Sequence, residues 1–340
     1  MKMKLNSMIK INKIVSNVKG RRVMIEKRKV VLVGTGFVGM SMAYSILNQD
    51  CGVNELILID VVKDKAVGEA MDLCHGLPCS SSHMKIRAGE YDECRDADIV
   101  VITAGLNQKP NQTRLELAEA NAKIMKDITL SVIENGFNGI FLVASNPVDL
   151  MTKVVQQVSG FNPSRVIGSG TALDTARLRY LIGEYLNVSN KNVHAYIMGE
   201  HGDSSFVPWE YVYVGCKKVI DILKSANKPL DDLNKIYVDV RDAAYEIINR
   251  KKATYYGIGL GLTRIVKTIL NDTNEVLTVS SYLNEKYGQN DIYMGVPTII
   301  NSEGARELLE LELSNEDQAK MDNSAKVLKE AMKSINEVIK

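Results

Sequence analysis

A chain of 340 residues, 45% hydrophobic and 24% charged, can bury a large core and fits two domains of roughly 150 residues. Its 42 lysines and arginines nearly balance its 41 aspartates and glutamates, so no overall field favours nucleic acid or an anionic membrane as a partner. No apolar run approaches the roughly 18 residues that would cross a bilayer. We therefore expect a small-molecule partner, and neither nucleic acid nor membrane binding.

The first 27 residues are basic, and a charge interrupts every short apolar stretch. A secretory signal needs an uninterrupted apolar core of about 7 residues or more, which is missing. We expect a disordered extension, or an upstream extension of a chain that starts at Met24; a targeting role is less favoured.

Five irregularly spaced cysteines are typical of reduced thiols, so the expected location is the cytoplasm. No second Cys/His cluster accompanies Cys74 and Cys79, so we expect no metal.

From Lys29 onward, short β-branched runs alternate with longer helical patterns, as in a parallel sheet covered by helices. The runs lack polar alternation, which is typical of strands buried on both faces. The pattern predicts strands at Val30–Val33, Leu56–Ile59, Met84–Ala88, Ile99–Ile102, Ile140–Val143 and Arg165–Ile167. The first half of the chain is therefore predicted to be an α/β domain.

A glycine motif, Gly34-Thr35-Gly36-Phe37-Val38-Gly39, follows the first predicted strand directly. Gly34 and Gly36 permit a tight turn and close approach to a pyrophosphate, and Gly39 lets the next helix pack on the strand. The second strand ends in Asp60, whose carboxylate can accept both ribose hydroxyls of NAD and would repel the 2′-phosphate of NADP. This order predicts a Rossmann domain, with a doubly wound parallel sheet, that binds NAD over residues 28–167; a glycine turn without a ligand is the weaker alternative.

After Gly168 the pattern changes to long amphipathic helices with few strand-like segments, such as Val193–Met198. Apolar residues recur at three- and four-residue steps over residues 230–247 and 321–339, which describes two helix faces. Ser314, three residues before Asp317, fits the N-cap of the last helix. The change predicts a second, α+β catalytic domain over residues 168–340.

His201 lies between glycines just after a strand-like run, so we expect its ring in a loop that faces a cleft. With a reference pKa of about 6.5, an imidazole can remove a hydroxyl proton as hydride leaves carbon and return it in the reverse direction. Asp174 and Arg177, three residues apart, share a helix face. Asp174 could orient His201 while Arg177 binds a substrate carboxylate, although the spacing alone favours an intrahelical ion pair.

The chain resembles the lactate/malate dehydrogenase family from about Lys29 to its end, on these motifs and on their order. The resemblance implies that His201 is the acid and base, that Asp174 is its partner, and that Arg177 clamps the substrate carboxylate. It also implies that Arg114 lies in a loop that closes over the substrate, where it polarises the carbonyl.

The same resemblance extends the cofactor site and decides the substrate. It implies cofactor contacts at Val38, Lys65, Tyr91, Gly105, Ser145, Asn146, Ser169 and Ile258, with Asn146 also on the substrate oxygen. Malate dehydrogenases similar to this chain carry Arg where this chain has Gln108, to pair with a second carboxylate, while lactate dehydrogenases carry Gln. Thr254 matches the residue that limits the pocket. The implied reaction is reduction of pyruvate to L-lactate; a malate or branched 2-hydroxy-acid dehydrogenase is the alternative, which Ala144 leaves open.

Arg179 and His194 match the pair that binds fructose 1,6-bisphosphate across a subunit interface in allosteric bacterial members of the family. The resemblance implies a bisphosphate-activated homotetramer; a surface arginine and a strand histidine are the alternative.

An NAD-dependent glycosidase is a rival function with a similar first domain. It would need a set of metal-binding cysteines and histidines beyond the nucleotide domain, and Cys216 and His201 lie in the wrong motif for that. A non-catalytic NAD-binding protein is disfavoured, because it would be expected to have lost at least one of four residues that are all present: His201, Asp174, Arg177 and Arg114.

Overall fold

Six parallel strands form the centre of the fold in a computed structural model that describes residues 14–18, 21–25, 28–106 and 114–340. In sheet order they are β8 (Val166–Gly168), β7 (Ile140–Val143), β6 (Ile99–Ile102), β3 (Lys29–Val33), β4 (Glu55–Ile59) and β5 (Lys85–Ala88). The strand order reverses between β3 and β6, as a doubly wound sheet requires. The six predicted strands and the Rossmann class are thereby confirmed.

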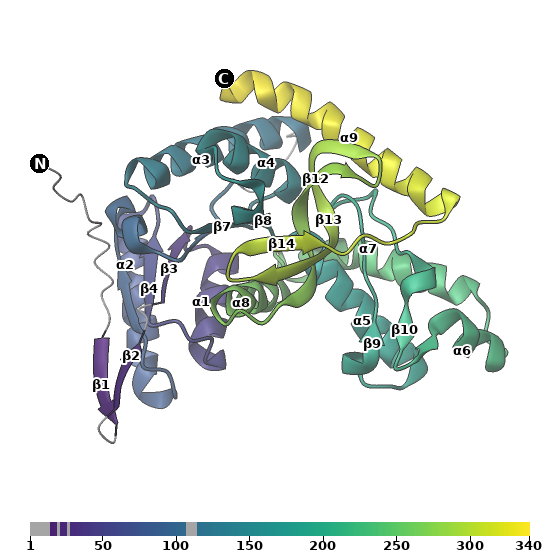
Figure 1. Ribbon diagram of the computed structural model, residues 1–340, viewed down its shortest axis with the longest axis horizontal. Helices are drawn as coiled ribbons and strands as arrows, with labels where there is room; N and C mark the ends of the chain where they lie inside the picture. Colours follow the sequence, from purple (N-terminus) through teal and green to yellow (C-terminus); the bar gives the residue numbers. More distant parts are fainter. Residues whose placement is uncertain (1–13, 19–20, 26–27, 107–113) are drawn as a thin grey trace, which may run out of the picture.

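Helices cover both faces of this sheet (Figure 1). On one face, α3 (Arg114–Glu134) and α4 (Val148–Ser159) pack with the C-terminal helix α9 (Asn315–Ile339) around the core that contains Val31 and Val33. On the other face, α1 (Phe37–Gln49), α2 (Lys63–Gly76) and α8 (Tyr256–Leu270) pack around Val30 and Leu32. Alternate strand residues thus serve separate cores, which explains the unbroken apolar runs.

An antiparallel meander extends the sheet beyond β8. Its strands are β12 (Glu275–Lys286), β13 (Gln289–Asn301) and β14 (Gly304–Leu308), and Ser280 of β12 pairs with Gly168 of β8. Few strands were expected in this half of the chain. The prediction missed the β12–β13 hairpin because its central residues are buried and therefore show no polar alternation.

The rest of the second half is mostly helical. Its other elements are α5 (Ala172–Leu186), β9 (Val193–His194), β10 (Tyr213–Val214), β11 (Lys217–Lys218), α6 (Val219–Ser225) and α7 (Asp231–Lys251). Short 3₁₀ turns occur at Leu77–Cys79, Tyr91–Asp96, Pro163–Arg165, Asn190–Asn192 and Trp209–Tyr211. The two predicted helices are confirmed as α7 and α9. The Ser314 hydroxyl accepts from the Asp317 amide at 3.1 Å, as expected for an N-cap.

The expected strand at Val193–Met198 is wrong beyond His194. The chain leaves β9 there, and Met198 forms only an isolated bridge with Phe206. Gly199, at a φ of +99°, then exchanges backbone hydrogen bonds with Gly295 of β13 at 2.8 and 2.9 Å. This turn against the central sheet carries the segment that contains His201.

The basic N-terminal segment contains an antiparallel hairpin, β1 (Ile14–Val18) with β2 (Arg21–Ile25), which forms a sheet of its own. Regular structure was not expected here. The two strands are rich in β-branched residues, a composition that favours strand pairing.

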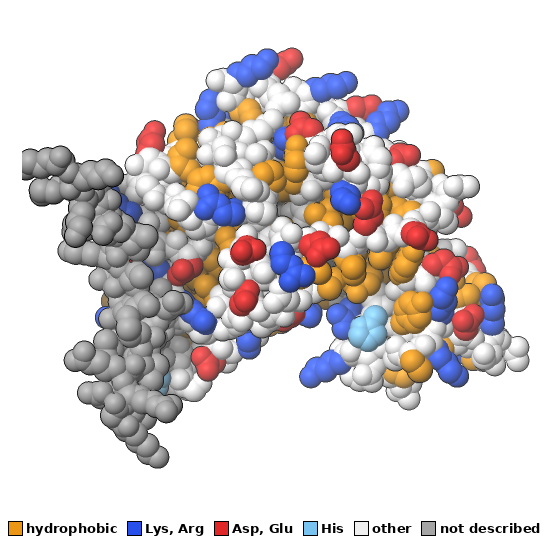
Figure 2. Space-filling view, in the orientation of Figure 1, with side chains coloured by type: hydrophobic (Ala, Val, Ile, Leu, Met, Phe, Trp, Pro, Cys, Tyr) orange, Lys and Arg blue, Asp and Glu red, His pale blue; other side chains and the backbone are white. Residues whose placement is uncertain are grey.

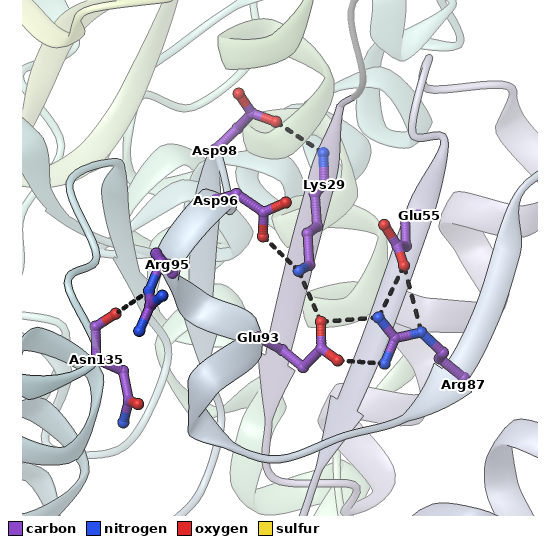
Figure 3. A network of polar contacts seen from close by, with 8 residues as sticks. All are labelled: Lys29, Glu55, Arg87, Glu93, Arg95, Asp96, Asp98 and Asn135. Carbon is purple, nitrogen blue, oxygen red and sulfur yellow. Dashed lines mark hydrogen bonds and ion pairs between the residues drawn. The ribbon is translucent and has the colours of Figure 1, made fainter. Parts of the chain in front are cut away.

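A charged network lies at the amino end of β3 (Figure 3). Lys29 is 2% exposed, and its ammonium donates to Glu93 at 2.8 Å and to Asp96 at 2.6 Å. Arg87 bridges Glu93 and Glu55, the first residue of β4. A buried ammonium is tolerated only when it is paired in this way. Because the glycine motif follows the opposite, carboxyl end of β3, we assign the network to the fold and not to the site.

Acidic and basic side chains are intermingled on the face shown in Figure 2. This distribution agrees with the near balance of charges in the sequence. Among the described residues, no helix combines the length and apolarity needed to cross a membrane.

Candidate active site

Three predicted residues meet at one hydrogen-bonded cluster. His201 Nδ1 and Asp174 Oδ2 are 2.6 Å apart and share a hydrogen bond, and Arg177 Nη1 donates to Asp174 Oδ1 at 2.9 Å. Asp174 and Arg177 lie in the first two turns of α5, while His201 comes from the loop after β9. The intrahelical ion pair considered above therefore exists, and His201 binds the same carboxylate.

The cluster opens into a cavity of about 290 Å³. His201 and Arg177 line it together with Asn146, and α7 contributes Arg241 and Tyr245 to the lining. The volume suits a small organic acid. Sequence reasoning did not find the α7 residues, because an amphipathic stripe shows which helix face is buried but not which residues at its edge face a cavity.

The charges in the cluster suit a proton donor beside an anion-binding group. Burial acts to lower the pKa of His201, but the Asp174 carboxylate outweighs it and raises that pKa to about 9. Burial acts to raise the pKa of Asp174, yet the His201 and Arg177 cations hold it below its usual value. At neutral pH the ring is therefore protonated and Asp174 is ionised.

The glycine motif forms an open turn at the amino end of α1. Gly34 has a φ of +102°, and a Cβ there would lie 2.6 Å from the Ala104 nitrogen; at Gly39 it would lie 2.2 Å from the Gly34 oxygen. A Cβ at Gly36 would meet nothing within 4 Å, and no side chain caps the helix. The uncapped helix start beside open space fits a pyrophosphate.

Asp60 follows β4 at the same edge of the sheet. One of its carboxylate oxygens accepts from the Thr35 amide and hydroxyl at 2.8 Å, and the other accepts from the Val62 amide at 3.0 Å. Burial acts to raise the pKa of Asp60, but these hydrogen bonds and the nearby Lys65 hold it below its usual value. Asp60 also adds to the negative charge near Tyr91. An ionised carboxylate at this distance from the glycine turn fits the adenosine ribose of NAD.

Other predicted cofactor residues follow the carboxyl ends of the central strands. Ser145, after β7, is buried and donates to the Ala104 oxygen at 2.5 Å. The Ser169 amide, after β8, donates to the Val143 oxygen at 2.8 Å. Gly105, after β6, is exposed, and Val38 is partly buried in the first turn of α1. These residues share the edge where ligands bind in doubly wound folds.

The buried Asn121 of α3 joins two of these loops, and it was not predicted. Its side chain accepts from the Leu106 amide and donates to the Asn146 oxygen, each at 2.8 Å. No sequence motif identifies such a residue, because its role depends on the position of α3 beside the loops that contain Leu106 and Asn146.

Two predicted site residues, Thr254 and Ile258, are not brought to the cavity. Gln108 lies outside the described residues, and Arg114 is the first residue of α3. Thr254 lies between α7 and α8, and Ile258 packs against the core from the first turn of α8. Neither lines the cavity that contains His201.

The two predicted regulatory residues, Arg179 and His194, do not line the same cavity. Arg179 of α5 lines a second cavity, of about 270 Å³, with Arg264 of α8. Burial lowers the pKa of Arg179, and the neighbouring Arg264 charge lowers it further. His194 is exposed on β9, outside this cavity.

The chain matches one family in both halves. A model described as the lactate/malate dehydrogenase NAD-binding domain matches residues 28–168, and one described as the lactate/malate dehydrogenase alpha/beta C-terminal domain matches residues 171–339. "L-lactate dehydrogenase 1" of Bacillus cereus is 54% identical over 305 residues, which are 89% of this chain and 97% of that protein. "L-lactate dehydrogenase 2" of Bacillus cereus is 55% identical over the same shares.

Solved structures agree in fold. A lactate dehydrogenase from a Medee basin deep-sea metagenome library superposes with a TM-score of 0.89 at 50% identity, covering 91% of this chain and 99% of that one. The minor L-lactate dehydrogenase of Enterococcus mundtii, in its ligands-bound form, superposes with a TM-score of 0.88 at 49% identity, covering 91% and 98%.

Proposed function

The chain belongs to the lactate/malate dehydrogenase family, and we propose that it is an NAD-dependent L-lactate dehydrogenase that interconverts pyruvate and L-lactate. The observation that carries the proposal is the hydrogen-bonded group of His201, Asp174 and Arg177 at a cavity of small-acid size. When bound, NADH supplies the hydride that reduces the carbonyl carbon. The protein must then supply a proton and a site for the carboxylate.

Arg177 binds the substrate carboxylate in this proposal. One guanidinium nitrogen is held by Asp174 at 2.9 Å, and the side chain lines the cavity. A guanidinium has five donors in a rigid plane, so it can make two parallel hydrogen bonds to a carboxylate while keeping this contact. The bound acid is thereby placed beside His201.

His201 gives its proton to the substrate oxygen. Its Nδ1 is bonded to Asp174, which leaves Nε2 as the donor toward the cavity. Asp174 fixes the ring orientation and stabilises the imidazolium before transfer. In lactate oxidation the neutral ring removes the hydroxyl proton. We propose that Arg114 and Asn146 assist at the substrate oxygen, as the family resemblance implies.

The choice of pyruvate over a dicarboxylate depends on Gln108 and Thr254. A neutral amide leaves a second carboxylate unpaired in a closed site, which costs far more than contact with a methyl group. We expect the purified protein with NADH to turn over pyruvate at least about 100-fold more efficiently, as kcat/KM, than oxaloacetate. 2-Oxoisocaproate is the third substrate in the assay. Preference for oxaloacetate or the branched acid would overturn this substrate assignment.

Activation by fructose 1,6-bisphosphate is the regulatory part of the proposal. It is supported by the two arginine charges at the second cavity, because an anion there relieves the repulsion between Arg179 and Arg264.

Assembly as a homotetramer is supported by large apolar side chains that are exposed on α1, α2 and α8: Tyr44, Met71 and Leu260 are 62%, 54% and 55% exposed. A cytoplasmic location is supported by the five cysteines, none of which is in a disulfide.

Fructose 1,6-bisphosphate is expected to lower the apparent KM for pyruvate by about 5-fold or more. Arg179→Ala should lose this response, because the half-buried guanidinium supplies part of the anion site. Arg250→Ala, at an exposed position on α7, is the matched control and should keep the response. Pyruvate saturation curves with and without the bisphosphate provide the test, and identical curves for the unmodified protein would refute activation.

A further inference from the structure

A second carboxylate holds the loop that contains His201. Asp149, in the first turn of α4, is 3% exposed, and its Oδ2 accepts from the His201 backbone amide at 2.8 Å. Its Oδ1 accepts from the hydroxyl of Ser280 on β12 at 2.6 Å. Both oxygens of a fully buried carboxylate are therefore fixed, one of them by the residue that carries the reacting ring.

The packing at this point leaves little freedom. A Cβ at Gly168 of β8 would lie 2.7 Å from the Ser280 Cβ and 2.3 Å from the Thr152 hydroxyl, so the absence of a side chain lets β12 approach α4. Ser280 is fully buried, and its hydroxyl donates to the Asp149 carboxylate. Asp149 also lies three residues after Asn146, which lines the cavity. The segment 146–149 thus connects the cavity wall to the His201 loop.

We propose that Asp149 is a positioning residue for the reaction: its buried carboxylate fixes the backbone of the His201 loop and stabilises the positive charge on the His201 ring. The inference rests on the proposed function, since it assigns a further residue to the same site. Asp149 touches neither the substrate cavity nor the reacting atoms, and it acts through His201.

The surrounding charges support this role. Asp174, Asp149 and Arg177 act on the His201 ring: the two carboxylates raise its pKa and the guanidinium lowers it. Burial raises the pKa of Asp149 to about 6, although hydrogen bonds from Ser280 and His201 act against the rise, and Glu200 adds to it. Asp149 is therefore mostly ionised above pH 6, throughout the range in which His201 loses its proton.

Asp149→Asn removes the charge and keeps the geometry. The amide oxygen can still accept from the His201 backbone, and the Ser280 hydroxyl can rotate to accept from the amide nitrogen. The pKa of His201 is expected to fall by about one pH unit. Glu246→Gln, at an exposed position on α7, removes one carboxylate without touching the cluster and should leave the pKa unchanged.

The pKa is measured in two ways. In the protein without cofactor or substrate, NMR of the ring carbons titrates the four histidines, and His201→Gln identifies the His201 signal. In the second measurement, the alkaline midpoint of kcat/KM for pyruvate reduction should shift by the same amount. A His201 pKa that is the same in both proteins would overturn the proposal and leave Asp149 as a structural residue.

Failure of the inference is distinguishable from failure of the proposed function. The titration without substrate reports on the Asp149–His201 link even if pyruvate is not the substrate, whereas absence of pyruvate turnover by the unmodified protein rejects the function alone. Should Asp149→Asn not fold, the unmodified protein tests the same link: the His201 ring signals should show a second, smaller step near pH 6, where Asp149 gains its proton. Ser280→Ala removes a hydrogen bond that favours ionised Asp149 and should move that step to higher pH. Absence of the step in the unmodified protein contradicts the inference.

Discussion

Replacing His201 with glutamine is expected to lower kcat for pyruvate reduction by about 1,000-fold. Glutamine is polar and of similar length, but it has no proton to donate at an accessible pKa. NADH binding should change little, because the glycine turn and Asp60 lie beside α1 and β4, away from the loop that contains His201. The measurement is steady-state NADH oxidation, with NADH affinity determined by fluorescence titration.

The matched control is His83→Gln, which changes an exposed histidine outside the cavity and should retain full activity. The unmodified protein should also show the proton donor in its pH dependence. Since the pKa of His201 is raised to about 9, pyruvate reduction should persist to near that pH and be lost above it. Lactate oxidation needs the neutral ring and should rise over the same range. A His201→Gln variant with near-normal kcat would eliminate His201 as the donor.

Arg177→Lys is expected to raise the KM for pyruvate by about 100-fold. Lysine keeps the positive charge but cannot make two parallel hydrogen bonds to a carboxylate while also holding Asp174. Losing one charge-assisted hydrogen bond costs ~1.5–3 kcal/mol, which is roughly 10- to 150-fold in affinity. The change should fall mainly on KM, because the hydrogen bond between His201 and Asp174 remains.

Arg241→Lys is the comparison for that prediction. Arg241 lines the same cavity from α7, but its guanidinium pairs with Asp242 and not with Asp174. A smaller increase in KM is expected there. Equal effects from the two substitutions would mean that the cavity attracts anions by its general charge and that Arg177 is not a specific clamp.

The sequence was sufficient to predict the parallel sheet and the His201–Asp174–Arg177 group for different reasons. The strands were readable because burial on both faces removes polar residues from short runs such as Ile99–Ile102. Nothing in the sequence itself shows that His201 lies beside Asp174, because the two residues are 27 positions apart. The contact between them was predicted from the family resemblance.

What was missed depends on packing between distant segments. Asp149 was not predicted as a site residue, because its contact with the His201 backbone exists only where α4 meets the loop after β9. The β12–β13 hairpin was missed because its buried positions carry serine, threonine and glycine beside apolar residues, a mixture with no clear period. The turn at Gly199 could not be foreseen because its partner, Gly295, is almost 100 residues away.

Product analysis is the direct test of whether this chain reduces pyruvate with NADH and a proton from His201. Purified protein would be incubated with pyruvate and NADH, and the lactate formed would be resolved into its two enantiomers and compared with the NADH consumed. One L-lactate is expected for each NADH consumed. No NADH consumption, or D-lactate as the product, would contradict it.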